Sequence, residues 1–272
     1  MSEIAQGPDR FVLIIGAMKC GTSSLFHNLS FHPALCGSAT KEPMYFSQHA
    51  YSWDTNTYLS LWPDWDGSVH HRALEASTNY TKSSNFPAAA PRIAAAARRE
   101  GFDFRFIYIV RHPIERLDSF YRNALLNQEW GKSFPLPSAE SDIVAHHAIE
   151  TSRYAKQIDL YLEHFSRDQL LLLKFEDFIS DPITVLNTVC TFLGVPPLPS
   201  WPKAYQTFNS SRSLLVHWRN RIPGGLPSGI TAADLLAWQL PQVHRDKVMD
   251  LLRDDMWRLR YQHGLDTSSW DL

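Results

Sequence analysis

The sequence predicts an α/β fold in which a mostly parallel central sheet is flanked by helices, giving three layers. Three observations lead to this fold class. Short apolar runs rich in β-branched residues recur along the chain, as expected of strands buried on both faces. Segments with apolar residues at helical spacing alternate with these runs, which is the order that builds parallel strands joined by crossover helices. A glycine-containing turn joins the first predicted strand to the first predicted helix.

The first half of the chain contains three strand–helix pairs. The predicted strands cover residues 11–15, 72–80 and 104–110, and the predicted helices cover 22–30, 93–99 and a segment that starts at Pro113. The run at 11–15 is entirely apolar and ends at Gly16, after which Leu25 and Leu29 recur at helical spacing. Because the first turn of a helix tolerates proline, Pro113 marks the start of the third helix.

The second half of the chain adds one strand–helix pair and a helical C-terminal region. In order, the predicted elements are a loop at 128–141, a long helix at 143–165, a strand at 170–175, a helix at 182–192, an irregular segment at 201–229 and helices at 232–261 with a break at Pro241. Asp181 is expected to cap the helix at 182–192, and Gly194 to end it. We expect one domain over 1–272, with a disordered N-terminus at 1–9 and with the irregular loop and C-terminal helices of 200–272 on the same domain.

Charge and composition exclude several classes of protein. The chain has 26 Lys and Arg against 28 Asp and Glu, so no overall positive field exists to hold nucleic acid or an anionic membrane surface. No run of 18 apolar residues occurs, and the first residues lack the basic and apolar regions of a signal peptide. We therefore expect a cytoplasmic protein with no nucleic-acid partner and no stable membrane insertion. The three cysteines share no metal-ligand spacing and are expected to be reduced thiols.

The turn after the first strand has the composition of a phosphate-binding loop. A buried strand leads through Gly16 and Gly21 into a helix N-terminus, whose N–H groups bind anions. These glycines have the spacing of G-x-x-x-x-G-K-[ST], but Thr22 stands where that motif has its lysine, and Lys19 lies three residues earlier. Since a kinase or ATPase needs the lysine on the β- and γ-phosphates, this P-loop-like turn favours a leaving group other than that of ATP.

This segment, G-x-x-K-x-G-T-[ST]-[ST]-L after an N-terminal strand, resembles the 5′-phosphosulfate loop of sulfotransferases that use 3′-phosphoadenosine-5′-phosphosulfate (PAPS). The branch it resembles most contains the heparan sulfate and related carbohydrate sulfotransferases. The resemblance implies that PAPS is the cofactor, that it leaves as adenosine 3′,5′-bisphosphate, and that no metal takes part. It also implies that Lys19 contacts the bridging oxygen and the 5′-phosphate, neutralising charge that develops as the sulfuryl group departs. The other implied cofactor contacts are Cys20, Gly21, Thr22, Ser23 and Ser24.

A second predicted anion site follows the strand at 104–110. The sequence from Arg111 to Tyr121 resembles the family's 3′-phosphate motif, R-[DN]-P-x-x-R-x-x-S-x-[YF], and implies that Arg111 and Ser119 hold the 3′-phosphate of PAPS. His112 stands where the motif has Asp or Asn. For Arg116 we expect a structural role, paired with a neighbouring carboxylate on a solvated face.

A third candidate anion site lies in the irregular C-terminal segment. Residues 208–213 resemble the loop with which this branch closes over the 3′-phosphate, and this implies a role for Arg212 and Ser213. A flexible polar loop without a ligand is the alternative interpretation. The stretch from Lys174 to Gly194 also matches a family pattern, which we interpret as scaffold.

Glu42 is the candidate general base. It lies beside apolar and aromatic residues, and a carboxylate that is partly removed from water has a pKa raised toward the range of a useful base. The surrounding sequence resembles the family's K-E-x-x-[YF]-F motif, whose glutamate takes the proton from the acceptor. The alternative is a surface glutamate paired with Lys41. None of the 12 histidines lies in a motif that matches the histidine-dependent branch of the family.

The acceptor is the least determined part of the prediction. We expect sulfuryl transfer to a hydroxyl, and less favourably to an amine, of a small molecule such as a secondary metabolite or of a glycan. The carbohydrate branch has a lysine where this chain has Ala76, and Lys82 or an arginine is the candidate replacement. A group of tryptophans could line a sugar site or belong to the core: Trp53, Trp62, Trp65 and Trp130. Two other functions compete, a P-loop kinase that uses ATP and a nucleotide-binding module without catalysis.

Overall fold

The computed structural model describes residues 7–48, 50–127, 143–201 and 231–270. It divides into two compact units, one of residues 1–110 and 156–206 and the other of residues 111–155 and 207–272. The first unit contains the sheet and the second is helical. The expectation that 1–272 form one domain stays a prediction.

The first unit is built on a five-stranded sheet in which every neighbouring pair is parallel. Its strands, in spatial order, are β2 (Leu35–Gly37), β3 (Arg72–Ala76), β1 (Arg10–Gly16), β4 (Asp103–Val110) and β5 (Leu170–Lys174). The central strand is covered on both faces, since Phe11, Val12, Leu13 and Ile14 are all fully buried. The predicted α/β fold with a mostly parallel sheet is therefore confirmed.

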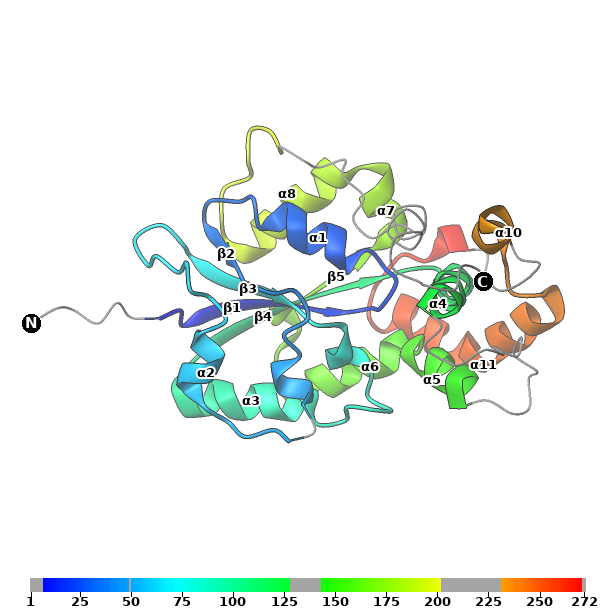
Figure 1. Cartoon of the computed structure of the whole chain (residues 1–272), viewed down its shortest axis with the longest axis horizontal. Helices are drawn as coiled ribbons and strands as arrows, with labels where there is room; N and C mark the ends of the chain where they lie inside the picture. Colours follow the sequence, from blue (N-terminus) through cyan, green and yellow to red (C-terminus); the bar gives the residue numbers. More distant parts are fainter. Residues whose placement is uncertain (1–6, 49, 128–142, 202–230, 271–272) are drawn as a thin grey trace, which may run out of the picture. The chain divides into compact units, whose positions relative to one another are not determined.

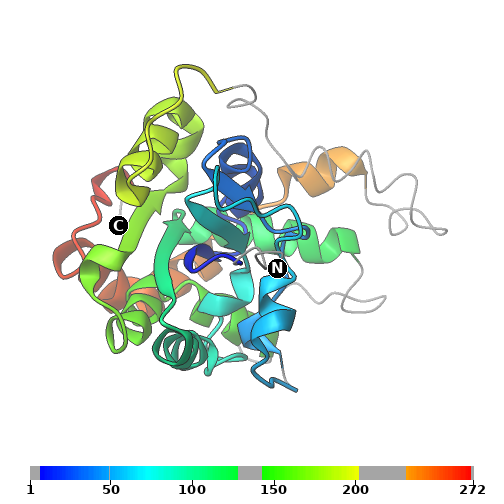
Figure 2. The ribbon, with the colours of Figure 1, turned by 90° about the vertical axis from the view of Figure 1, so that its left-hand side faces the viewer.

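Helices cover both faces of this sheet (Figures 1 and 2). The helices of the first unit are α1 (Thr22–Leu29), α2 (Thr55–Leu59), α3 (Ala89–Glu100), most of α6 (Tyr154–Leu162), α7 (Phe175–Ser180) and α8 (Pro182–Leu193). In both views α1 and α8 lie on one face and α3 on the other. The predicted caps of α8 are present, because the Asp181 side chain accepts a hydrogen bond from the Thr184 N–H and Gly194 adopts φ 73°.

An aromatic cluster fills the core at one end of the sheet. The ring of Phe11 lies 5.2 Å from those of Tyr58 and Trp62. Trp62 is a core residue that donates its indole N–H to the Leu74 carbonyl at 3.1 Å. Trp53 is half-buried and donates to Glu100 at 2.9 Å. Trp62 therefore serves the fold, whereas Trp130 lies outside the described residues.

The second unit is a group of helices held by buried polar contacts. It contains α4 (Pro113–Asn127), α5 (Ile143–Thr151), α10 (Ala232–Ala237) and α11 (Gln242–Tyr261). Asp118 of α4 accepts hydrogen bonds from the Leu240 N–H at 2.7 Å and from Arg245 at 2.8 Å. Both carboxylate oxygens are thus satisfied in a side chain that is almost completely buried, which fixes α4 against the start of α11.

Several predicted elements differ from the structure. The long helix expected at 143–165 is wrong: α5 ends at Thr151 and α6 begins at Tyr154. The hydroxyl of Ser152 donates to the Ala148 carbonyl and accepts from Arg116, so it competes with the helical pattern at the break.

The predicted strand at 72–80 stops at Ala76, because residues 78–81 form a 3₁₀ turn. The short elements β2 and α2 carry too few residues for a periodic signal. The predicted loop at 128–141 lies outside the described residues.

Candidate functional site

The turn between β1 and α1 requires both of its glycines. Gly16 has φ 153°, and a Cβ there would lie 2.1 Å from the hydroxyl oxygen of Thr81. Gly21 has φ 87°, and a Cβ there would lie 2.8 Å from the ring of Phe175. Side chains of the same unit therefore lie so close to Gly16 and Gly21 that neither position can hold a residue with a Cβ. The predicted glycine turn is confirmed as a structural feature.

The backbone at this turn presents a helix N-terminus. Gly21 occupies the N-cap position of α1, no side chain caps the helix, and its first turn has no acidic residue. The first turn consists of Thr22, Ser23 and Ser24, the hydroxyl residues expected at the phosphate site. Because the first N–H groups of a helix have no intrahelical acceptors and lie at the positive end of the helix dipole, this arrangement suits an anion.

Lys19 adopts a left-handed backbone conformation within the turn. Its φ is 71°, and only three non-glycine residues of the described chain have positive φ: Lys19, Glu42 and Met44. A residue with a Cβ is sterically strained in this region. Its side chain therefore points in a direction that an unstrained backbone would not give it. Two of these three strained residues are the two predicted catalytic residues, although neither prediction used backbone conformation.

Glu42 is fixed at the carboxyl end of β3. Its N–H donates to the Ala76 carbonyl at 2.8 Å, while the N–H of Met44 donates to the Ser77 hydroxyl at 3.0 Å. Ser77 in turn donates its N–H to the Ile14 carbonyl of β1 at 3.1 Å. Since β1 and β3 are adjacent and parallel, the Lys19 turn and Glu42 both belong to the same edge of one sheet. The fold of this unit thus brings the Lys19 turn and Glu42 to the carboxyl ends of two adjacent strands, and this arrangement is what matters most for function.

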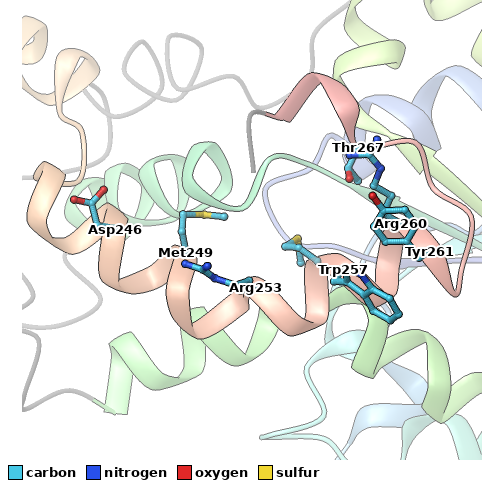
Figure 3. Close-up of a pocket in the computed structure, with 8 residues that line it drawn as sticks. Asp246, Met249, Arg253, Trp257, Arg260, Tyr261 and Thr267 are labelled. Atoms are coloured by element: carbon cyan, nitrogen blue, oxygen red, sulfur yellow. The ribbon is translucent and has the colours of Figure 1, made fainter.

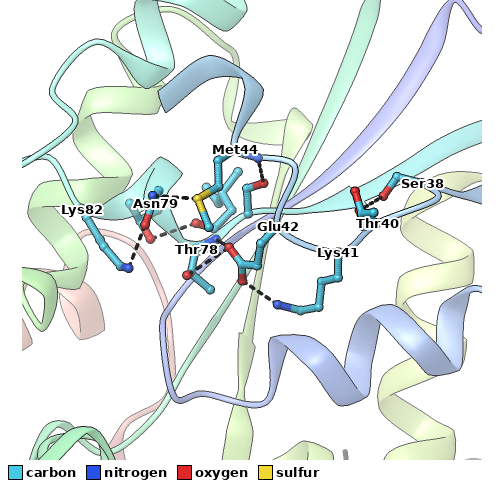
Figure 4. Close-up of polar contacts among 11 residues, drawn as sticks. Ser38, Thr40, Lys41, Glu42, Met44, Thr78, Asn79 and Lys82 are labelled. Atoms are coloured by element: carbon cyan, nitrogen blue, oxygen red, sulfur yellow. Dashed lines mark hydrogen bonds and ion pairs between the residues drawn. The ribbon is translucent and has the colours of Figure 1, made fainter. Parts of the chain in front are cut away.

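The Glu42 carboxylate lies in a polar environment (Figure 4). Lys41 Nζ contacts Oε1 at 2.5 Å, and Oε2 accepts from the N–H of Thr78 at 2.8 Å and from its hydroxyl at 3.3 Å. The expected pairing with Lys41 is therefore present, but the expected apolar surroundings are not. A carboxylate has about four lone-pair sites, so three donors orient the group and leave room for one further proton donor.

Lys82 directly follows the turn that contains Thr78, the partner of Glu42. Its ammonium group donates to the Asn79 side chain at 2.8 Å, and Asn79 also donates to the sulfur of Met44 at 3.2 Å (Figure 4). The 3₁₀ turn Thr78–Thr81 precedes Lys82 and contains Thr78, which binds Glu42. Lys82 thus directly follows the turn that binds Glu42 and lies six residues after Ala76, where the family has its lysine.

Glu75 is a buried carboxyl that motif matching left without a role. It lies in β3 and is completely buried. Burial raises its pKa to about 8; the Tyr80 hydroxyl opposes this shift and the charge of Glu42 reinforces it. Burial also raises the pKa values of the neighbouring phenols of Tyr58, Tyr80 and Tyr161, and the Glu75 charge adds to each shift. Glu75 is therefore held mainly as the neutral acid near neutral pH.

The wild-type protein is expected to lose stability as the pH rises from about 5 to about 8, and Glu75→Gln is expected to flatten this dependence. The folded-state pKa of Glu75, about 8, lies above its ordinary value of 4.5, so the unfolded chain releases this proton first. The stabilisation is complete below the unfolded pKa and is lost as the pH passes through the folded pKa. Urea unfolding across this range measures the slope, with exposed Glu163→Gln as the control. Equal slopes in Glu75→Gln and the wild type would contradict the assignment.

Arg111 and Ser119 lie in the second unit at the start of α4. Arg111 pairs with Glu115 at 3.2 Å, and its carbonyl accepts a hydrogen bond from the Tyr154 hydroxyl at 2.8 Å. Ser119 lies two turns into α4 and is buried. To bind an anion, the Arg111 guanidinium would either release Glu115 or contact Glu115 and the anion together. The Glu115 side chain is 45% exposed, so water can solvate its carboxylate when the pair separates.

His112 replaces the Asp or Asn of the family motif in a capping role. The Ile114 N–H donates to Nδ1 of His112 at 3.2 Å, and Nε2 lies 2.8 Å from the Trp270 carbonyl. Because Nδ1 accepts, the proton is assigned to Nε2, which donates to that carbonyl. An N-cap side chain needs an acceptor for the first N–H groups of the helix, and the imidazole supplies it here. The imidazole therefore offers the Ile114 N–H an acceptor, as an Asp or Asn side chain at this position could also do.

Arg116 has the expected structural role but not the expected location. It is completely buried, not on a solvated face, and it bonds the Ser152 hydroxyl at 2.9 Å and the Ala148 carbonyl. The nearby carboxylates have other partners, since Glu115 pairs with Arg111 and Asp118 with Arg245. The remaining predicted anion ligands, Arg212 and Ser213, lie outside the described residues and stay predictions.

Thr78 and Glu75 are the residues that sequence reasoning missed. Thr78 lies 36 residues after Glu42, and only folding brings the two together. Glu75 had a visible signal, because its carboxylate stands among the apolar residues Ala73, Leu74 and Ala76, but its burial was not apparent. The described part of the chain contains no group of three or more His, Cys, Asp or Glu side chains placed to hold a metal ion. Across the described ranges, no helix combines the length and apolar character needed to span a bilayer.

Comparisons with known proteins identify the family to which the chain is similar. Residues 9–214 match the family model of the sulfotransferase domain. The chain is 26% identical over 229 residues to bifunctional heparan sulfate N-deacetylase/N-sulfotransferase 4 of Mus musculus. The aligned region covers 78% of this chain and 25% of that protein. It is 30% identical over 194 residues to human (Homo sapiens) heparan sulfate glucosamine 3-O-sulfotransferase 3B1, which covers 67% of this chain and 45% of that protein. The chain thus spans less than half the length of these relatives.

A solved structure supports the same fold. The sulfotransferase of Alicyclobacillus acidocaldarius superposes with a TM-score of 0.70 at 24% sequence identity, covering 98% of this chain and all of that chain. At this identity the likeness demonstrates a shared fold. The family model, in contrast, matches well over half of the sequence. The chain therefore belongs to the sulfotransferase domain family and lies close to its heparan sulfate branch.

Proposed function

We propose that the chain transfers the sulfuryl group of PAPS to a hydroxyl of a glycan or related acceptor, with an amine as the less favoured acceptor. The observation that carries this proposal is the juxtaposition at one sheet edge of a glycine turn containing Lys19 and a carboxylate, Glu42, held by Thr78. PAPS fits the turn because the uncapped N-terminus of α1 and its hydroxyl residues offer donors to a phosphate. When bound, PAPS supplies an activated sulfuryl group.

The protein's own groups divide the work of an in-line transfer. Glu42 takes the proton from the acceptor oxygen as that oxygen approaches, since its carboxylate is oriented by Lys41 and Thr78 and retains acceptor capacity. As the acceptor oxygen bonds to sulfur, the bond from sulfur to the 5′-phosphate oxygen would break and adenosine 3′,5′-bisphosphate would leave. Lys19 would stabilise the negative charge that this leaving group gains, and so would favour the transition state over the bound ground state. In the second unit, Arg111 and Ser119 recognise the phosphate that distinguishes PAPS from ordinary adenine nucleotides.

Thermal unfolding with three nucleotides tests the cofactor assignment. Adenosine 3′,5′-bisphosphate is expected to stabilise the protein, by about 2.7 kcal/mol at 100 times its Kd, whereas 5′-AMP and ATP with magnesium have little effect. The stabilisation should be lost in Arg111→Ala and retained in Arg153→Ala, since Arg153 also pairs with a glutamate in the second unit. Stabilisation by ATP with magnesium alone would favour the kinase alternative. Binding of the bisphosphate without transfer from PAPS to any acceptor would favour the non-catalytic module.

The cytoplasmic location and the absence of a metal requirement stay predictions within this proposal. Turnover that is unchanged after extensive treatment with a chelator is the expected outcome for the metal. The kinase alternative is weakened by the position of Lys19, because Thr22 occupies the first turn of α1 where ATP-using loops have their lysine.

A further inference from the structure

The C-terminal helix of the second unit, α11, leaves one of its sides open to solvent. This side lines a groove of about 530 Å³ (Figure 3). The α11 residues of the groove follow one another at three- and four-residue spacing, so they share one side of the helix. They include Asp246, Met249, Arg253, Trp257, Arg260 and Tyr261.

Aromatic side chains are exposed on this open side. Trp257 is 53% exposed and Tyr261 is 63% exposed, and their ring centroids lie 5.4 Å apart. In contrast, Val248 and Leu252 are buried on the side with which α11 packs into its unit. Large aromatic side chains gain stability by burial, so two neighbouring exposed rings indicate a surface that another molecule covers.

The open side has an acidic end and a basic end. Asp246 lies near the start of α11 and Arg260 near its end, and both are exposed (Figure 3). Asp246 accepts a hydrogen bond from Gln242 at 2.8 Å, and the Arg260 guanidinium lies 5.3 Å from the centre of the Tyr261 ring. Among the residues that the structure describes, neither Asp246 nor Arg260 takes part in an ion pair. A face with opposite charges at its two ends is complementary to the same face running in the opposite direction.

The residues of this face are spaced symmetrically about Arg253. Asp246 and Arg260 lie seven residues before and after it, and Met249 and Trp257 lie four residues before and after it. In a two-fold symmetric pair, each contact between two different residues occurs twice. Two antiparallel copies of α11 centred on Arg253 would therefore place Asp246 opposite Arg260, and Met249 opposite Trp257, at both ends of the contact. Methionine sulfur packs favourably against aromatic rings.

The central arginine is compatible with this arrangement. The two Arg253 side chains would meet at the symmetry axis, and each is paired with Asp250 of its own helix. The charge at the axis is thus already balanced within each copy. A parallel pair would instead set Asp246 against Asp246 and Arg260 against Arg260, which is repulsive. Charge complementarity therefore favours the antiparallel pair.

We propose that the open side of α11 binds α11 of a second copy of this chain, antiparallel and centred on Arg253, to form a dimer. From Asp246 to Arg260, a helix rise of about 1.5 Å per residue gives a contact about 21 Å long. A single helix face of this length is small beside a standard interface, so the dimer is weak and reversible. The dimer does not depend on the proposed function, since it uses no residue of the transfer chemistry.

Sedimentation of the full chain from about 1 μM to about 1 mM tests the dimer. The wild-type mass is expected to rise with concentration from 31.2 kDa toward twice that value. Asp246→Arg and Arg260→Asp should each weaken the dimer by about tenfold or more, because each replaces two attractions by two repulsions. Both side chains are exposed, so the unfolding temperature should change little.

Recombining the two charge reversals distinguishes the antiparallel pair from other arrangements. An equimolar mixture of the two single variants should associate again, because one chain then carries arginine and the other aspartate at both positions. The double variant should also dimerise like the wild type, because each charge still meets its opposite across the symmetry axis. Trp257→Ala should weaken the dimer by about tenfold without changing its charge pattern. The control Lys247→Glu reverses an exposed charge of α11 outside the groove and should dimerise normally.

Four outcomes would overturn this inference. The first is a wild-type chain that stays monomeric over the whole concentration range. The second is wild-type association in both single charge variants, which would assign the dimer to another surface. The third is a double variant as weak as the single variants, which would exclude the antiparallel pairing. The fourth is an equal loss in Lys247→Glu, which would show a general effect of charge. Binding of adenosine 3′,5′-bisphosphate by the same variants tests the proposed function separately.

Discussion

Replacing Glu42 with glutamine is expected to abolish sulfuryl transfer while leaving the affinity for adenosine 3′,5′-bisphosphate unchanged. A glutamine can still accept a hydrogen bond from the Thr78 N–H, so the segment should keep its position on Ala76. It cannot accept a proton from the acceptor, and loss of a positioned general base costs about 10² to 10⁴ in rate. Transfer of labelled sulfuryl groups from PAPS and calorimetric binding of the bisphosphate measure the two effects separately.

The matched control for this variant is Glu163→Gln, which changes an exposed glutamate of the same unit. It should retain wild-type turnover. A Glu42→Gln enzyme with near-normal turnover would remove Glu42 from the mechanism. A loss of bisphosphate affinity would show instead that Glu42 supports the cofactor site. Because the charge of Glu42 raises the pKa of Glu75, the same variant should also lower the pKa of Glu75.

Replacing Lys19 with methionine is expected to lower kcat by about 10²-fold or more, since a group that stabilises developing charge acts mainly in the transition state. Methionine keeps the length and apolar stem of the side chain, and its backbone is about as strained as that of lysine at φ 71°. The fold of the turn should therefore survive, because its shape depends on Gly16 and Gly21. Single-turnover rates with saturating PAPS isolate the chemical step from cofactor binding.

Lys156→Met is the control, since Lys156 is an exposed lysine of the same unit. Lys19→Arg should recover part of the lost rate, because it restores the charge without the original geometry. Near-full activity of Lys19→Met would exclude a catalytic role. A fall in affinity for PAPS with an unchanged single-turnover rate would assign Lys19 to ground-state binding alone.

The fold was largely predictable because its strands are short apolar runs buried on both faces. The strands containing Phe11 and Phe104 lie at the centre of the sheet, where the pattern is clearest. Prediction was poorer where local pattern and tertiary contacts compete. The helical periodicity at 143–165 continues through Ser152. In the structure, however, the buried Arg116 donates to the Ser152 hydroxyl at the point where α5 ends and α6 has not yet begun.

The site was predicted in its residues but not in its environment. Spacing and resemblance pointed to Lys19 and Glu42, and the structure places both at one sheet edge in left-handed conformations. The expectation of apolar surroundings for Glu42 failed, because the partner that orients it, Thr78, comes from a distant part of the chain. Sequence neighbours are poor guides to the solvation of a loop side chain, since that depends on which other segment folds over it.

The sequence by itself determined the order of strands and helices, the glycine turn with its displaced lysine, and the family resemblance. These properties are local, because they depend on periodicity and on residues close together in the chain. Only the tertiary structure decided that Glu75 is a buried neutral acid, that His112 caps α4, and that Trp257 belongs to an open groove. Burial, hydrogen-bond partners and exposure are set by segments that are remote in sequence, so no local pattern contains them.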